Sequence, residues 1–167
     1  YEWALCAWGV PGLLYAAVRP LSWRAGLCAG GLFGVLIGWG ITNWAVEASL
    51  GYFGMNRLIA WGFAFGVWLV CSGLPYAIIL PAYQWVAPRV TPGGRAGIGA
   101  WLWVVGDILR AGQWSSMPWE LLGHTQFAQL WCVQIADLGG VYAVSFVIAF
   151  VSIALGEICR DLYTGER

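Results

Sequence analysis

Lysine is absent from this 167-residue chain, histidine occurs once, and charged residues make up only 10% of it. A soluble domain carries about 25% charged residues, so this chain cannot cover a water-facing surface of its own. All eight cationic residues are Arg, and they balance the acidic residues to a formal net charge of zero. Because no basic excess attracts phosphate, we expect no nucleic acid partner.

Apolar residues dominate the composition of the chain. They make up 60% of the chain, which also holds 13 Trp, and the mean hydropathy is +0.72. Such a chain belongs in lipid, and Trp favours the headgroup region, where its ring and its N–H are both satisfied. We therefore expect a membrane protein with lipids as partners.

Cysteine occurs five times, with no C-x-x-C motif and no His close to any of the five. Single Cys residues in apolar runs are most often small buried side chains. The five Cys residues are Cys6, Cys28, Cys71, Cys132 and Cys159. Because the pattern fits neither a metal site nor a disulfide framework, we predict no metal and no cofactor.

Five apolar segments predict an all-α, polytopic transmembrane helix bundle of about five spans, forming a single domain over residues 1–167. The expected spans are about 4–18, 24–46, 57–87, 97–112 and 139–158. A segment of about 23 residues reaches roughly 34 Å as a helix, enough to cross a hydrocarbon core of about 30 Å. Pro75 and Pro81 should kink the third span or end it early.

The positions of Arg predict the orientation of these spans. If five segments cross, six of the Arg residues fall on one side, namely Arg19, Arg24, Arg89, Arg95, Arg160 and Arg167. The opposite side holds only Arg57, and the long loop at about 113–138 holds no Arg. Since positive residues mark the cytoplasmic side, we expect the chain end in the cytoplasm and loop 113–138 outside.

The second span carries small residues at intervals of four: Gly26, Gly30, Gly34 and Gly38. This spacing lets two helices approach closely. Tight packing inside the bundle is the main expectation, and a face for a second copy or a partner subunit is the alternative.

Asp107 and Arg110 lie three residues apart within the apolar fourth span. Charges at membrane depth are costly, so such residues pair with each other or line a polar cavity. One interpretation is an internal ion pair that stabilises the bundle near its outer end. The other is that Arg110 meets the anionic headgroup of a lipid, because guanidinium suits phosphate.

The outer loop gathers the remaining polar residues, and a Glu with a His could act as acid and base. They are Glu120, His124, Gln126, Gln129, Gln134 and Asp137. No Ser or Cys nucleophile stands in a recognisable arrangement with them, so hydrogen-bonded loop residues are the simpler interpretation. We predict no catalytic residue here.

Aromatic residues in the same region indicate contact with lipid. Trp114, Trp119 and Trp131 are typical of an interfacial belt, and the alternative is an apolar cradle for an acyl chain. Trp44 and Glu47 close the second span on the same outer side and could join the cluster.

Several runs in order resemble the apolipoprotein N-acyltransferase family. Residues 118–126 are similar to the family's P-W-x-x-L-G-Y-S-Q run, and residues 139–146, which include Tyr142, are similar to its G-G-V-Y-x-x-S-F helix start. Residues 107–112 look like E-W-L-R-G, and residues 34–54 resemble the glycine-rich helix and F-G-G turn. The order and spacing agree from about residue 5 to 158. Departures are His124-Thr125 for Tyr-Ser, Asp107 for Glu, and Met55 for the second Gly.

The resemblance implies a membrane bundle of a bacterial inner-membrane protein that moves an acyl chain from a phospholipid to the N-terminal cysteine of a lipoprotein, on the outer face. In the family, a nitrilase-like domain supplies a catalytic Glu, Lys and Cys. A chain without Lys cannot form that triad, so we expect these residues alone to be inactive.

Three hypotheses follow for the protein as a whole. It is the membrane part of a complete acyltransferase, or an accessory or scaffold transmembrane subunit of a larger complex derived from such an enzyme. In the third, it is a lipid-handling or transport protein whose resemblance is coincidental.

Overall fold

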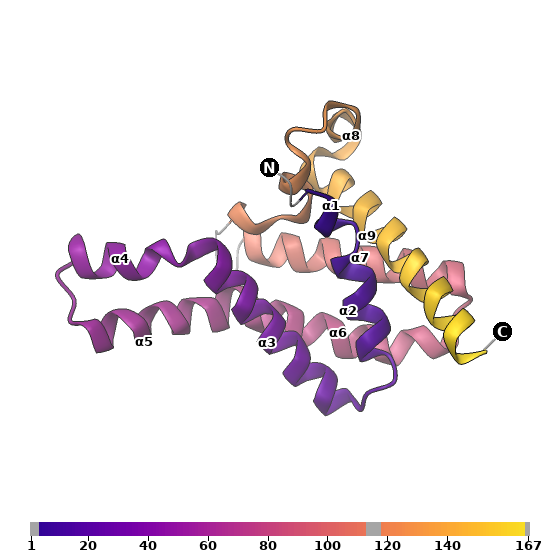
Figure 1. Ribbon diagram of the computed structural model, residues 1–167, viewed down its shortest axis with the longest axis horizontal. Coiled ribbons are helices and arrows are strands. Elements are labelled where there is room, and N and C mark those ends of the chain that lie inside the picture. Colours follow the sequence, from indigo (N-terminus) through magenta and orange to yellow (C-terminus); the bar gives the residue numbers. More distant parts are fainter. Residues whose placement is uncertain (1–3, 113–117, 166–167) are drawn as a thin grey trace.

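The computed structural model describes residues 4–112 and 118–165. Over these residues it consists of helices and connecting turns without a strand, which confirms the expected all-α bundle (Figure 1).

The chain enters through two short helices, α1 (Ala4–Ala7) and α2 (Val10–Val18). A turn at Trp8 and Gly9 separates them, so the expected segment 4–18 is not one continuous helix. Pro11 stands in the first turn of α2, where a missing N–H costs no hydrogen bond.

The second segment also divides, into α3 (Trp23–Thr42) and α4 (Trp44–Gly51). The hydroxyl of Ser22 starts α3 by accepting a hydrogen bond from the Ala25 N–H at 3.3 Å. The helix ends at Thr42, four residues before the expected boundary, and a turn at Asn43 leads into α4. Figure 1 shows α4 running on as one arm of a hairpin that extends from the other helices.

The other arm of that hairpin is α5 (Arg57–Trp68). It continues through a π-helical turn, η1 (Leu69–Gly73), into α6 (Leu74–Val86). Of the two effects expected of Pro75 and Pro81, a kink or an early end, the early end does not occur, because the helical stretch runs over 33 residues from Arg57 to Arg89. The helix is irregular just before Pro75, at the π-helical turn.

The π-helical turn explains why the chain passes Pro75. In a regular helix the Pro ring meets the carbonyl four residues earlier, which here belongs to Cys71. Cys71 lies within η1, and the wider turn makes room for the ring. Pro81 is accommodated inside α6.

After the short turn η2 (Ala87–Arg89), the chain forms α7 (Pro92–Ala111). This helix begins five residues before the expected segment 97–112. Thr91 sets that start, since its hydroxyl accepts a hydrogen bond from the Gly94 N–H at 3.3 Å and Pro92 follows at the first helical position.

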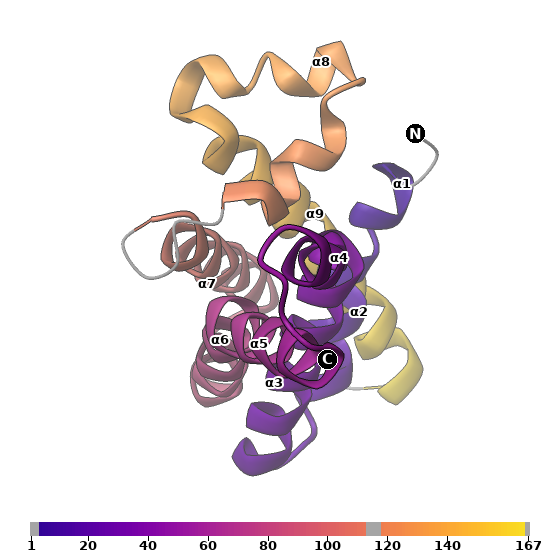
Figure 2. The ribbon, with the colours of Figure 1, turned by 90° about the vertical axis from the view of Figure 1, so that its left-hand side faces the viewer.

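The last third of the described chain is a folded loop followed by one long helix. The loop contains η3 (Pro118–Glu120), η4 (Leu122–Gln126) and α8 (Leu130–Val133). Figure 2 shows the segment with α8 at one end of the molecule, beyond α7. The long helix α9 (Ala136–Thr164) is interrupted at Gly140, whose φ of 66° requires a residue without a side chain.

Three of the described helices are long and apolar enough to cross a membrane: Trp23–Thr42, Arg57–Arg89 and Ala136–Thr164. The apolar stretch Ala4–Val18 is shorter. At 20 residues α7 has the length of a span, but it is less apolar because it carries Arg95, Asp107 and Arg110.

The glycines of α3 face the helical stretch that contains α6. A side-chain carbon added at Gly30 would collide with the backbone of Tyr76, and one at Gly34 with the backbone of Ser72. Gly26 lies against Gln84, and Gly38 lies against Trp68. The predicted small-residue positions therefore pack inside this chain, and they let α3 and α6 approach to backbone contact.

Candidate functional site

The bundle has two chemically different ends. The C-terminal end is where α9 stops, beside the loops at 19–22 and 87–91 (Figure 1). The loop end carries η3, η4 and α8. We keep these two names below.

At the C-terminal end, one buried carboxylate joins four helices. Glu157 on α9 accepts from Arg19 at 2.6 Å and from Arg95 at 3.2 Å. The hydroxyl of Tyr83 on α6 donates to its other oxygen at 2.8 Å. Asp161 adds a longer contact of 3.5 Å to Arg19. Two cations and a hydroxyl thus compensate a carboxylate that is only 2% exposed.

The sequence analysis missed Glu157 as a site residue. The signal was present, because a Glu inside an apolar span requires a partner. Its partners Arg19 and Arg95, however, are 138 and 62 residues away, and spacing along the chain does not reveal such contacts.

At the loop end, the predicted pair of Asp107 and Arg110 lies inside the bundle. Their charged atoms are 3.7 Å apart, and the side chains are 0% and 1% exposed. Arg110 also donates to the Tyr76 hydroxyl at 3.0 Å, and Asp107 accepts from the Leu122 N–H at 3.4 Å. The pair therefore joins α7 to α6 and to η4, and the Arg110 side chain is not at the surface where a headgroup would lie.

An apolar cavity of about 490 Å³ opens next to this pair, and we call it the first cavity. Helices α1, α2, α3, α6 and α7 form its wall, and η3 and η4 close the loop end. Its lining consists of Ala7, Val10, Phe33, Ile37, Ile41, Tyr76, Trp103, Trp119, Leu121, Leu122, His124 and Thr125. The volume lies within the range of about 300–1,000 Å³ that is usual for small-molecule sites.

Two predicted loop residues meet at the rim of the first cavity. His124 and Thr125 are exposed there. Gln126, the next residue, is buried and holds the start of the chain in place. It accepts from Trp8 Nε1 at 3.2 Å and donates to the Ala4 carbonyl at 3.0 Å.

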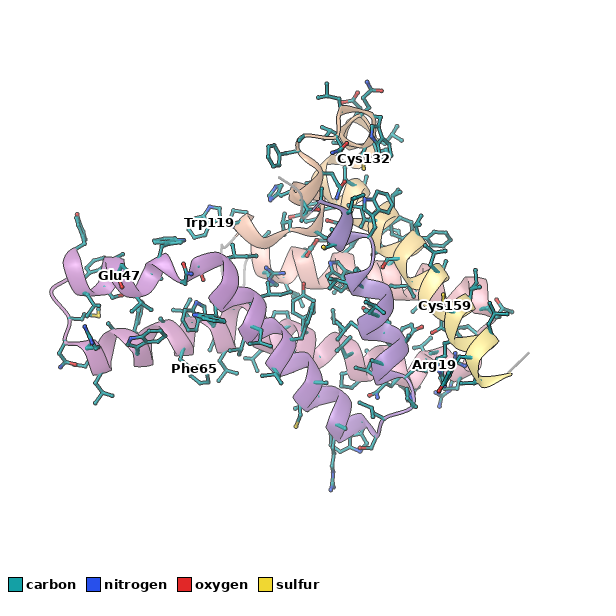
Figure 3. The ribbon with its side chains drawn as sticks, viewed as in Figure 1. Arg19, Glu47, Phe65, Trp119, Cys132 and Cys159 are labelled. Carbon is teal, nitrogen blue, oxygen red and sulfur yellow. The ribbon has the colours of Figure 1, made fainter. Side chains whose placement is uncertain are left out.

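Trp119 connects this region to the α4–α5 hairpin. Its ring packs edge-on against Trp44, with centroids 5.9 Å apart, and Figure 3 places it above the junction of α3 and α4. It lines both the first cavity and a second cavity of about 210 Å³. The lining of the second cavity consists of Thr42, Trp44, Ala45, Ala48, Ser49, Phe53, Phe63, Val67 and Trp119.

Three other predicted residues do not join these cavities. Glu47 lies on the exposed side of α4 (Figure 3), and Tyr142 is half-buried on α9. The backbone of Glu120 belongs to η3, but its side chain lies outside the part of the chain that the structure describes. Trp114 is outside the described residues as well.

The loop is fixed to α9 by close backbone contact. The Gly123 N–H donates to the Ser145 hydroxyl at 2.9 Å, and a side chain on Gly123 would strike Val141. Cys132 on α8 is buried beneath this loop. Burial raises the pKa of the Cys132 thiol, so the thiol stays protonated at neutral pH and is a poor nucleophile.

The loop end therefore presents an apolar cavity with polar side chains at its rim. Within residues 4–112 and 118–165, no group of three or more His, Cys, Asp or Glu side chains could hold a metal ion. An apolar cavity with a polar rim among membrane-length helices has the character of a site for the acyl chain of a lipid whose headgroup stays outside.

Comparison with known proteins agrees with the resemblance found in the sequence. The family model described as the apolipoprotein N-acyltransferase N-terminal domain matches residues 1–154. No solved structure matches this chain.

Curated relatives carry the same family name. The apolipoprotein N-acyltransferase of Geobacter metallireducens is 37% identical over 109 residues, which cover 59% of this chain and 20% of that protein. The Pseudomonas putida protein of that name is 25% identical over 171 residues, covering 95% of this chain and 31% of the relative. This chain thus spans about a fifth to a third of the relatives it matches.

Proposed function

This chain belongs to the apolipoprotein N-acyltransferase family, and from that premise we propose that it serves as the membrane part of a lipoprotein acyltransferase and holds the acyl donor. The donor would be a membrane phospholipid, and the acceptor would be the N-terminal cysteine of a lipoprotein. The observation that carries the proposal is the first cavity, an apolar space of about 490 Å³ with an exposed polar rim.

An acyl chain fits the character of this cavity better than a polar substrate does. Its wall is built from helices with apolar side chains, and its deepest charged neighbours, Asp107 and Arg110, already compensate each other. A polar ligand inside it would lose its hydration without new partners. The headgroup would stay at the rim beside His124 and Thr125.

The orientation we propose follows from the Arg residues. The loops of the C-terminal end hold Arg19 and Arg89, Arg24 lies in the first turn of α3, and Arg160 lies near the end of α9. Positive residues favour the cytoplasmic side. The C-terminal end would then face the cytoplasm, and the first cavity would open toward the outer leaflet of a bacterial inner membrane.

We further propose that these 167 residues do not perform the transfer themselves. The family's chemistry needs a Lys, and this chain has none. Acyl transfer would require a catalytic Glu, Lys and Cys supplied from outside this sequence.

A second role, as an accessory transmembrane subunit of a larger complex, is favoured by one observation. The α4–α5 hairpin exposes large apolar side chains, including Tyr52 at 84% and Leu58 at 85%. These could face a partner subunit as well as lipid. Purification from native membranes in mild detergent, with identification of co-purifying chains, separates the two roles.

Filling the first cavity tests the proposed lipid site. Ile37 lines the cavity, whereas its neighbour Leu36 is 52% exposed and lies outside the lining. In detergent-solubilised protein, Ile37→Trp should lower retention of dioleoyl phosphatidylglycerol several-fold in native mass spectrometry, and Leu36→Trp should retain it like the wild type. Equal retention by both variants would contradict the proposal.

An activity assay tests the proposed lack of catalysis. Incubation of the purified chain with phospholipid and an N-terminal cysteine lipopeptide should give no N-acylated product. A thioester trapped on any of the five Cys would overturn this part.

A further inference from the structure

Trp119 separates the two apolar cavities of the loop end. It lines both, its side chain is 55% exposed, and it packs on Trp44 of the second cavity. The first cavity lies among α1, α2, α3, α6 and α7, while the second lies between the arms of the α4–α5 hairpin. The indole ring of Trp119 is therefore a shared wall of the first and second cavities.

The side chains that line the second cavity are mostly apolar, and its two hydroxyl groups already have partners. The Thr42 hydroxyl donates to the Gly38 carbonyl at 2.6 Å and accepts from Trp68 Nε1 at 2.9 Å. The Ser49 hydroxyl donates to the Ala45 carbonyl at 2.7 Å. These hydroxyls are occupied by carbonyls of their own helices and by Trp68 of α5. Apart from them and the indole N–H groups of Trp44 and Trp119, the side chains of the described lining offer only hydrocarbon.

The first cavity differs because its rim carries the exposed imidazole of His124. The Thr125 hydroxyl beside it donates to the Leu122 carbonyl at 2.7 Å and accepts from Gln126 at 2.9 Å. The second cavity is too small for a whole lipid and has no comparable rim among the described residues. A hydrocarbon chain in the second cavity must therefore belong to a molecule whose polar part is held elsewhere, and the nearest polar rim is that of the first cavity.

We propose that the two cavities form one site for a single diacyl phospholipid, with one acyl chain on each side of Trp119. This inference rests on the proposed function, because it takes the first cavity as an acyl-chain site. Two chains that leave one glycerol diverge around the ring, and the glycerol lies at the ring edge. The indole N–H and apolar ring of Trp suit that boundary between headgroup and chain.

The site should therefore distinguish a diacyl lipid from its single-chain relative. In detergent or bilayer the free chain already lies in an apolar medium, so the preference comes from packing contacts rather than from transfer out of water. We expect the wild-type chain to retain dioleoyl phosphatidylglycerol at least about threefold better than 1-oleoyl lysophosphatidylglycerol, a difference of about 0.7 kcal/mol that comes from packing contacts.

Filling the second cavity alone provides the test. Ala48 on α4 lines that cavity, and Ala17 on α2 is exposed and lines neither cavity. Ala48→Phe should reduce diacyl retention to the level of the lysolipid and leave lysolipid retention unchanged. Ala17→Phe, which adds the same side chain to another helix, should keep the wild-type preference. Native mass spectrometry of equimolar lipid mixtures measures both.

The outcomes separate this inference from the proposed function. If Ala48→Phe keeps the full preference for the diacyl lipid, the two-chain site is wrong while the first cavity still stands. If the wild type retains neither lipid, the proposed function itself fails. Trp119→Ala, which joins the two spaces, should weaken the preference without abolishing lysolipid retention, and an unchanged preference would also contradict the inference.

Discussion

The two ends of the bundle hold buried charge in opposite ways. At the C-terminal end, Glu157 draws together side chains from three other parts of the chain, as far as 138 residues away. At the loop end, Asp107 and Arg110 pair within a single helix. The first cavity is lined by Tyr76 and Leu122, which contact this ion pair.

The difference indicates how one end can be closed while the other stays open. A carboxylate shared between helices resists their separation, because parting them would leave charges unpaired in an apolar medium. Asp107 and Arg110 pair within α7, and their further bonds to the Tyr76 hydroxyl and the Leu122 N–H leave the neighbouring space open.

The contacts of Glu157 with Arg19, Arg95 and Tyr83, which we call the clasp, therefore hold the helices together at the C-terminal end. The loop end can accommodate a ligand.

Breaking the clasp should have the largest effect. Glu157→Gln keeps the shape but leaves Arg19 and Arg95 without their shared carboxylate, and we expect a loss of about 3 kcal/mol in the free energy of unfolding. The measurement is unfolding in mild detergent, followed by circular dichroism. Asp161→Asn, which removes only a 3.5 Å contact at a 23% exposed side chain, should cost less than about 1 kcal/mol. Equal losses for the two variants would show that Glu157 is not central.

A smaller effect should come from removing one hydroxyl at each end. Tyr83→Phe takes a donor from the buried Glu157 carboxylate, and we expect a loss of about 2 kcal/mol. Tyr76→Phe takes an acceptor from Arg110, which keeps Asp107 as a partner, so the loss should be about 1 kcal/mol. The same unfolding assay compares them, and a larger loss for Tyr76→Phe would reverse the assignment of the clasp.

The smallest expected effect is local and lies at the loop end. Gln126→Ala removes the contacts to Trp8 and Ala4 and should loosen η4 by about 1 kcal/mol. The Cys132 thiol is a probe for this loosening. It is 0% exposed and its raised pKa keeps it protonated, so it reacts slowly while the loop is closed. Maleimide labelling of Cys132, followed by peptide mass spectrometry, should quicken about fivefold. Unchanged labelling together with global destabilisation would mean that Gln126 supports the whole bundle.

The sequence predicts the helical architecture because its signals are local. Ser22, Asn56 and Thr91 cap the helices that follow them, and apolar runs mark membrane-length segments. The glycine positions of α3 could also be read from spacing, although the partner helix could not.

What escapes the sequence depends on distant contacts or on backbone detail. Glu157 appears as one acidic residue in an apolar run, and its partners come from other helices. The cavities need the bend at Asn43 and the placement of Trp119, neither of which has a periodic pattern. Thr91 and Pro92 indicate the start of α7 at Pro92, but the two glycines and Arg95 that follow them interrupt the apolar pattern.

The π-helical turn at Leu69–Gly73 has a consequence for how this chain can change in length. Such a turn holds one residue more than an α-helical turn, and each helical residue corresponds to a rotation of about 100°. Deleting one residue within the turn would therefore restore a regular helix and leave α6 almost unrotated. Deleting one residue from α5 instead would rotate α6 relative to α5 by about 100° and would strain the contacts of Tyr76 with Arg110 and of Tyr83 with Glu157 in the same step. A one-residue deletion should therefore be tolerated better within Leu69–Gly73 than in α5.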